Sequence, residues 1–375
     1  MQTLNDFIDA DPAVAKSATF GDRIRNLKEG GTFKDSKNAP IHRWFYYPTG
    51  FGVNLVYTAL KSFNIRKSET ILDPFVGSGT TSICAKSVGI GSIGIEAHPF
   101  VFQMAKAKLN WNLDLETMQS EVQSFLDKFN THLTRNKVSK YSLDSVPDLL
   151  HRLYTDRTLN QLLIARELLE DLHNDDYYLF FKVALATALR KVSRADTGWP
   201  YMLPRKKKVK ERSPMKVLRE LFEIQLADLA YTQRQCRKGG EAKLIQGDAR
   251  DLCMLSDESI NFAFTSPPYL NNFDYADRTR MEMYFFGESS SWREITEKVR
   301  SKLMMSATTQ VRRSDWDLED IFDSRIPVDL QTSLYSIIKE LSKRRLTRGG
   351  RKSYDIMVGG YFSDMLQISL KYTVY

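Results

Sequence analysis

A glycine-rich loop between two regular elements is the first feature that could do chemistry. The apolar run ETILD (69–73) predicts a buried strand, PFVGSGTTS continues it as a loop, and a helical pattern begins at Ile83. Gly77 and Gly79 would let the backbone approach a nucleotide-like ligand closely, at the carboxyl end of a parallel strand. Ser82 occupies the place of a third glycine, so the loop differs from the dinucleotide fingerprint.

A carboxylate follows the next apolar run. SIGIE (92–96) predicts a second buried strand and ends in Glu96. In nucleotide-binding sheets, an acidic residue after the second strand accepts hydrogen bonds from ribose hydroxyls. A tight turn in any doubly wound domain could show the same glycines and acid, so the interpretation of this pair depends on the other motifs.

Two prolines and a tyrosine directly follow the strand-like run SINFAFT (259–265), in SPPY (266–269). Consecutive prolines fix φ and offer no backbone donors, so the turn is rigid and extended. It could hold the carbonyl oxygens of Ser266 and Pro267 as fixed acceptors beside the ring of Tyr269. A flat heterocycle with an amino group fits this arrangement, because its amino hydrogens meet acceptors and its ring stacks on tyrosine. A plain Pro-Pro loop is the alternative when the motif stands alone; together with the upstream motifs, the chemical interpretation is favoured.

These motifs resemble those of the S-adenosylmethionine-dependent, amino-methylating DNA methyltransferases, which act on cytosine N4 or adenine N6. The family's cofactor motif is similar to DPFVGSGTT (73–81), and its catalytic motif, Asp, Asn or Ser before Pro-Pro-Tyr or Pro-Pro-Phe, is similar to SPPY. The resemblance covers about residues 40–112 and 240–290 and the final helix, with a looser match over 44–52. It implies S-adenosylmethionine as the cofactor, double-stranded DNA as the partner, and no metal.

The resemblance also implies roles for individual residues. Around the methionine part of the cofactor it places Asp73, Phe75, Gly77 and Gly79; at the ribose, Glu96; and at the adenine amino group, Asp248 of GDARD. The implied catalytic residues are Ser266, Pro267, Pro268 and Tyr269. Hydrogen bonds from the target amino group to Ser266 and the adjacent carbonyl would make its nitrogen more nucleophilic for direct methyl transfer, with positioning supplying much of the rate. The base must first be flipped out of the duplex.

The choice of target stays open between several hypotheses. Serine in the first catalytic position is commoner among the N4-cytosine enzymes, so cytosine N4 is favoured and adenine N6 is the alternative. Cytosine C5 chemistry needs a thiolate nucleophile, typically a cysteine after proline, and none of the three cysteines follows proline. An RNA base methyltransferase is a further alternative, and a non-catalytic DNA-binding subunit that needs a partner chain is one of another class.

Composition agrees with a nucleic-acid partner and a cytoplasmic location. The net charge is +8 over 375 residues, which favours a polyanion. Candidate DNA contacts are Lys206, Lys207, Lys208 and Arg278, although a basic cluster is as readily a solvated face. The unpaired cysteines fit a reducing cytosol and exclude a disulfide framework or zinc site. The most apolar stretch, 177–189, is interrupted by Lys182 and too short to span a bilayer, so we expect a cytoplasmic protein of a prokaryote or phage with no membrane contact.

The predicted fold is α/β, a Rossmann-like methyltransferase sheet with a large helical insertion. The expected segments are an N-terminal helix and connector (1–40), the cofactor-binding half (41–111), the helical insertion as candidate target-recognition region (112–240), the catalytic half with SPPY (241–287), and a basic region with a terminal helix (288–375). Four core strands are expected, at 69–73, 92–96, 242–248 and 259–265. The resemblance implies three further strands after the terminal helix, so C-terminal strands would be missing and the SPPY strand would lie at a sheet edge. We therefore expect a complementing polypeptide or a restriction-system partner.

Overall fold

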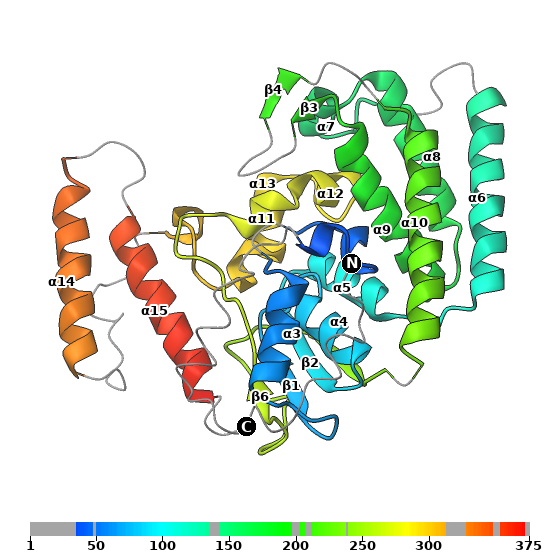
Figure 1. Ribbon diagram of the computed structural model, residues 1–375. Helices are drawn as coiled ribbons and strands as arrows, with labels where there is room; N and C mark the ends of the chain where they lie inside the picture. The colour runs from blue at the N-terminus through cyan, green and yellow to red at the C-terminus, as the bar shows by residue number, and fades with distance from the viewer. Residues whose placement is uncertain are drawn as a thin grey trace.

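The computed structural model is a mixed α/β fold with a small sheet among many helices (Figure 1). The residues that it describes are 35–47, 50–135, 143–196, 203–207, 212–237, 239–312, 328–347 and 353–371. The helix expected before residue 35 lies outside these ranges. No described helix is both long enough and apolar enough to cross a membrane.

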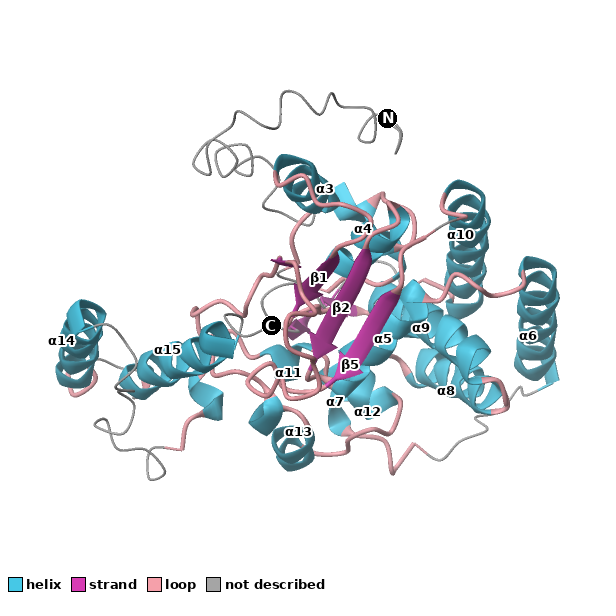
Figure 2. Ribbon diagram, turned by 90° about the horizontal axis from the view of Figure 1, so that it is seen from below, coloured by secondary structure: helices cyan, strands magenta, loops and turns pink. Residues whose placement is uncertain are grey.

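A parallel sheet forms the centre of the fold (Figure 2). Its strand order is β5 (Ala242–Gln246), β2 (Gly91–Glu96), β1 (Thr70–Asp73) and β6 (Phe262–Ala263). Every neighbouring pair is parallel; Leu72, for example, lies between Ile93 and Ala263. These are the four expected strands, which confirms the α/β prediction. Because the strands are parallel, the ends of β1 at Asp73 and of β2 at Glu96 meet at one edge of the sheet.

The strand that leads into SPPY is shorter than expected. Only two of its residues are paired in register with β1, although a ladder hydrogen bond extends it on either side. The N–H of Asn261 donates to the carbonyl of Thr70, and the N–H of Phe264 to that of Leu72, both at 3.0 Å. The prolines that follow cannot donate to the ladder, so regular pairing ends there. Within the described sheet, β6 is an edge strand, as expected.

Helix α3 (Val53–Ser62) precedes β1 in the chain, whereas α4 (Thr80–Ser87) follows β1 and α5 (Pro99–Leu109) follows β2; α4 and α5 pack beside the sheet. One apolar cluster joins α3 and α4 to β1 through the buried side chains of Val56, Leu60, Ile71 and Cys84. This cluster fixes α4, and therefore the glycine loop before it, against the sheet.

The helical insertion expected between the two halves is present. Its elements are α6 (Leu115–Arg135), α7 (Asp148–Leu153), α8 (Asp156–Glu170), α9 (Asp175–Val192), β3 (Ala195–Asp196), β4 (Leu203–Lys207) and α10 (Pro214–Gln235). Phe125, Phe181 and Phe222 bring α6, α9 and α10 together, with ring centroids 5.0 to 5.7 Å apart. The basic run begins inside β4, which pairs with β3. Lys206 and Lys207 belong to that strand, but their side chains and all of Lys208 lie outside the described part of the chain.

The C-terminal region is built from short elements and one helical pair. Its elements are α11 (Tyr275–Arg278), α12 (Arg280–Phe285), α13 (Trp292–Lys298), η5 (Arg300–Lys302), η6 (Thr308–Gln310), α14 (Val328–Arg344) and α15 (Tyr354–Lys371). Figures 1 and 2 show α14 and α15 on the side of the sheet opposite the insertion helices. The terminal helix expected within 288–375 is α15, which begins at Tyr354.

A buried carboxylate ties the insertion to the aromatic segment before α3. Asp228 on α10 is 2% exposed and accepts hydrogen bonds from the Ile41 N–H, Arg43 Nε and Trp44 Nε1, each at 3.0 Å. The Trp44 ring also packs edge-on against Phe180, with the centroids 5.5 Å apart. The insertion is therefore part of the main core.

We expect Asp228→Ala to lower the free energy of unfolding by about 3 kcal/mol, because it leaves buried N–H donors without an acceptor. Urea unfolding of the purified protein measures this loss. Glu220→Ala on the same helix is the control: its ion pair with Arg212 is exposed, so about 0.5 kcal/mol or less should be lost. Equal losses in the two variants would contradict the bracing role of Asp228.

Candidate active site

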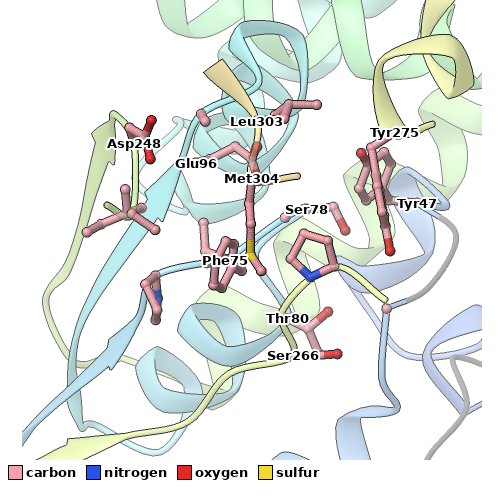
Figure 3. A pocket seen from close by; sticks show the side chains of 18 of the residues that line it. Tyr47, Phe75, Ser78, Thr80, Glu96, Asp248, Ser266, Tyr275, Leu303 and Met304 are labelled. Atoms are coloured by element: carbon pink, nitrogen blue, oxygen red, sulfur yellow. The ribbon is translucent and has the colours of Figure 1, made fainter. Parts of the chain in front are cut away.

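A pocket opens at the carboxyl edge of the sheet, where the glycine loop, the ends of β2 and β5, and the SPPY segment meet (Figure 3). Six of the expected site residues line it: Phe75, Gly77, Glu96, Asp248, Ser266 and Pro268. Motifs that lie far apart in the chain therefore share one cavity. Four other expected residues, Asp73, Gly79, Pro267 and Tyr269, lie close by in the chain but do not line the pocket as the structure describes it.

The two loop glycines have backbone conformations that disfavour other residues. Gly77 has φ of +53° and Gly79 has φ of +93°, both in the left-handed region. Gly77 faces the pocket, whereas a Cβ on Gly79 would contact Ile83 and Ala105, so Gly79 serves the packing behind the loop. At Gly77, just before α4 begins, the loop therefore exposes backbone to the pocket without an intervening side chain.

Asp73 supports the loop from behind. Its side chain is 1% exposed and accepts hydrogen bonds from the Phe75 N–H at 3.1 Å, Thr81 Oγ1 at 2.5 Å and Thr265 Oγ1 at 2.8 Å. Burial raises the pKa of Asp73 to about 6, despite these three donors. The carboxylate therefore joins the glycine loop to the segment just before SPPY, whereas the resemblance placed it beside the cofactor.

A buried lysine supports the same loop from the helical side. Lys108 Nζ donates to the carbonyl of Ser78 at 2.8 Å, and its side chain is fully buried. Burial lowers the pKa of Lys108 to about 7. Sequence analysis missed this residue, because a lysine in AKAKLN has the pattern of an exposed helix face.

Two acidic residues occupy one side of the pocket in Figure 3. Glu96 accepts a hydrogen bond from the His98 N–H at 2.8 Å and further ones from the backbone N–H groups of Gly77 and Ala97. Burial raises the pKa of Glu96 to about 7, and the nearby Asp73 carboxylate adds to the shift. The Arg250 guanidinium forms a bidentate ion pair with the Asp248 carboxylate, with Nε donating at 3.0 Å and Nη2 at 2.6 Å.

Two tyrosines occupy the other side of the pocket. Tyr47 comes from the segment loosely matched to the family, and burial raises its pKa well above the usual 10. Tyr275 follows SPPY, and its hydroxyl accepts a hydrogen bond from the Tyr269 N–H at 3.2 Å. The Tyr269 ring is 47% exposed, so a large aromatic face lies available beside Ser266 and Pro268.

A segment that sequence analysis did not select covers part of the pocket. We call Arg300–Met305 the cover segment; Lys302, Leu303 and Met304 of this segment line the pocket. Figure 3 shows the Met304 side chain reaching toward Phe75. Met304 also clusters with Ala249 and Ile368, so the cover segment connects the pocket to α15.

Arg278, expected at a phosphate, is instead buried at 7% exposure. Its short helix α11 packs between other elements, and its own carbonyl accepts a hydrogen bond from Arg190 Nη2 at 2.6 Å. Arg190 also binds the buried Glu282 carboxylate, which anchors this region to α9. Arg278 is therefore a buried residue and not a surface contact.

Comparison with known proteins gives a consistent assignment. A family model described as DNA methylase, of the N6/N4 type, matches residues 22–107. The Type II methyltransferase M.BsoBI of Geobacillus stearothermophilus is 24% identical over 378 residues, which cover 89% of this chain and 71% of the relative. M.AvaI of Nostoc sp. is 23% identical over 367 residues, with the same coverage of 89% and 71%.

A shorter match reaches M.MjaII of Methanocaldococcus jannaschii, also a Type II methyltransferase, at 29% identity over 150 residues, or 38% of this chain and 28% of the relative. No solved structure matches the chain. The pocket joins DPFVGSGTT and SPPY, and the matching relatives are named as Type II methyltransferases. These matches support a relationship to the amino-methylating DNA methyltransferases of the N4/N6 family.

Proposed function

We propose that this protein transfers a methyl group from S-adenosylmethionine to the exocyclic amino group of a flipped DNA base, with cytosine N4 favoured over adenine N6. The observation that carries the proposal is the shared pocket, in which Glu96 and the glycine loop lie together with Ser266 and Pro268. The names of the relatives support DNA methylation of the Type II kind.

The donor set of the pocket fits an adenosyl cofactor. Glu96 would accept hydrogen bonds from ribose hydroxyls, and Asp248 one from the adenine amino group, while Phe75, Ile95 and Met304 supply apolar walls for the flat ring. Backbone N–H groups of the glycine loop and the start of α4 suit the cofactor's carboxylate. When bound, S-adenosylmethionine supplies the methyl group on its positively charged sulfonium.

The SPPY segment would bind and orient the target base. An exocyclic amino nitrogen is a poor nucleophile, because its lone pair is delocalised into the ring. Acceptors at Ser266 Oγ and the adjacent carbonyl would hold both amino hydrogens and favour a more pyramidal, more nucleophilic nitrogen. Tyr269 would stack on the base, and the hydrogen bond from its N–H to Tyr275 fixes the backbone at that point. Serine at position 266 favours cytosine, in keeping with its frequency in the N4-cytosine enzymes.

We propose that the basic run at Lys206, Lys207 and Lys208 contacts the DNA backbone, which the net charge of +8 supports. Because Arg278 is buried, it has no part in this proposal. We further propose that the protein acts in a restriction–modification system, where methylation would protect a site from a partner endonuclease; the Type II names of the relatives support this.

The product of the reaction is the first test. Incubation of the purified protein with labelled S-adenosylmethionine and double-stranded DNA, followed by digestion and mass spectrometry of the nucleosides, should yield N4-methylcytosine. N6-methyladenine in its place would overturn the choice of base. Label that enters RNA but not DNA would overturn the substrate class, and label in neither, from folded protein, would overturn methyl transfer itself.

We expect Tyr269→Ala to reduce methyl transfer at least tenfold and to leave cofactor affinity unchanged. Stacking of a base on an aromatic ring contributes about 1–3 kcal/mol, and Tyr269 is exposed and does not line the pocket. Single-turnover rates and calorimetry measure the two effects. Tyr269→Phe should keep most of the rate, and Tyr231→Ala, an exposed tyrosine on α10, should keep all of it. Parallel loss of cofactor binding in Tyr269→Ala would show that this ring belongs to the cofactor site.

Cofactor affinity should depend on the protonation of Glu96. Its pKa is raised to about 7, so the group is largely protonated below neutrality, and ribose hydroxyl donors need the carboxylate. The affinity for S-adenosylhomocysteine should therefore fall as the pH drops below about 7, by up to tenfold per pH unit, and level off above it.

Calorimetry from pH 5.5 to 8 measures this dependence in the wild type and in Glu96→Gln. The variant should bind weakly throughout and lose the part of the pH dependence of affinity that Glu96 supplies. Any pH dependence that remains reports other groups, among them Asp73, whose pKa is raised to about 6. Identical slopes in the two proteins would remove Glu96 from the cofactor site.

A further inference from the structure

A buried carboxylate on the C-terminal helix lies at the junction between that helix and the pocket. Asp364 of α15 is 8% exposed. One of its oxygens accepts the Met305 N–H at 2.8 Å, and the other accepts Arg250 Nη1 at 3.2 Å. Burial raises the pKa of Asp364, and the Arg250 guanidinium opposes that shift. A desolvated carboxylate is costly, so the two bonds that it makes to other elements account for its place there.

The same guanidinium reaches the pocket. Arg250 holds both oxygens of Asp248, and its Nη2 also lies 3.4 Å from the carbonyl of Lys302 in the cover segment. A second residue of α15, Lys371, donates to the carbonyl of Arg250 at 2.6 Å. Arg250 therefore connects α15 with a pocket carboxylate and with the pocket cover.

The helix and the cover segment are also in tight steric contact. A Cβ on Gly360 would lie 2.4 Å from the sulfur of Met305, so a side chain there would force the Met305 side chain to move. At its other end the cover segment begins with Arg300, whose Nε donates at 3.0 Å to the buried Asp274 carboxylate. The cover segment is thus fixed at its start by Asp274 and at its end by Asp364.

We propose that α15 is part of the cofactor site and that Asp364 is its positioning residue: through Met305 and Arg250 it holds the cover segment and the Asp248 carboxylate in the positions that the adenosyl end of the cofactor requires. The proposal rests on the proposed function and adds to it a residue that touches neither cofactor nor base. Loss of the Asp364 carboxylate frees the Met305 N–H and removes one of the two carboxylates that orient Arg250. Leu303, Met304 and Asp248 then lose their fixed positions.

Calorimetry with S-adenosylhomocysteine tests this on the full chain, without any need for turnover. Asp364→Ala should weaken binding about tenfold, and the isosteric Asp364→Asn, which keeps one acceptor oxygen, should weaken it less. The matched control is Asp355→Asn, a buried carboxylate on the same helix that binds Ser342 and Arg345 beside α14, away from the pocket. This control should lose stability in thermal unfolding and keep its cofactor affinity.

Kinetics give a second readout that general destabilisation would not produce. In Asp364→Asn the KM for S-adenosylmethionine should rise, while kcat and the KM for DNA stay within about twofold of wild type. Because Asp364 acts through Arg250, the effects of Arg250→Gln and Asp364→Asn on affinity should be less than additive in the double variant.

The outcomes separate this proposal from the one it rests on. Wild-type affinity in both Asp364 variants, or an equal loss of affinity in Asp355→Asn, overturns the positioning role and leaves the proposed function standing. A folded wild-type protein that does not bind S-adenosylhomocysteine overturns both. Should Asp364→Ala fail to fold, the isosteric Asp364→Asn carries the same comparison.

Discussion

The hydrogen bonds to one buried carboxylate, Asp73, determine whether the two halves of the site meet. Its donors come from the glycine loop, from the first turn of α4 and from Thr265 immediately before SPPY. A carboxylate with this degree of burial is unfavourable unless its hydrogen-bond donors are in place. The positions of the three segments that carry these donors are therefore coupled. The glycine-loop side of the pocket and the SPPY side thus share one internal support, and neither side can shift without cost to the other.

The same loop depends on the insertion through a second buried ion. Lys108 holds the Ser78 carbonyl from α5, and α5 packs against α9 in the largest apolar cluster. The insertion is in turn fixed to the aromatic segment near Tyr47 by Asp228. Segments outside the methyltransferase motifs therefore help to stabilise the pocket. Damage to the aromatic core of the insertion would reach the cofactor loop along this route.

The parts of the fold that could be predicted from sequence are those with a local signal. The apolar runs before Asp73 and Glu96 have strand character, and the prolines of SPPY restrict their own turn, so these sites were identifiable without coordinates. The cover segment had no such signal, because Leu303 and Met304 lie in a basic region and are held at the pocket by contacts with residues distant in the chain, among them Asp274 and Ile368. Burial of Arg278 and Lys108 likewise depends on partners distant in the chain, which composition does not reveal. Six of the ten expected site residues line the pocket, whereas Lys108 and the cover segment, which lie around them, were not selected from the sequence.

Helix α14 stands apart from this network, because in the described chain its substantial contacts are with α15. Leu334 and Ile338 are its buried side chains, while Leu330, Tyr335 and Ile337 face outward. Detaching α14 exposes little apolar surface and breaks no bond at the pocket, so it belongs to the low end of the local unfolding scale. Amide hydrogen exchange should accordingly fall into tiers along the C-terminal region: rapid in α14, slower in α15, which the pocket holds through Asp364, and slowest in β1 and α9. Such tiers would mark a cooperative centre and a C-terminal periphery that opens locally at a lower free-energy cost.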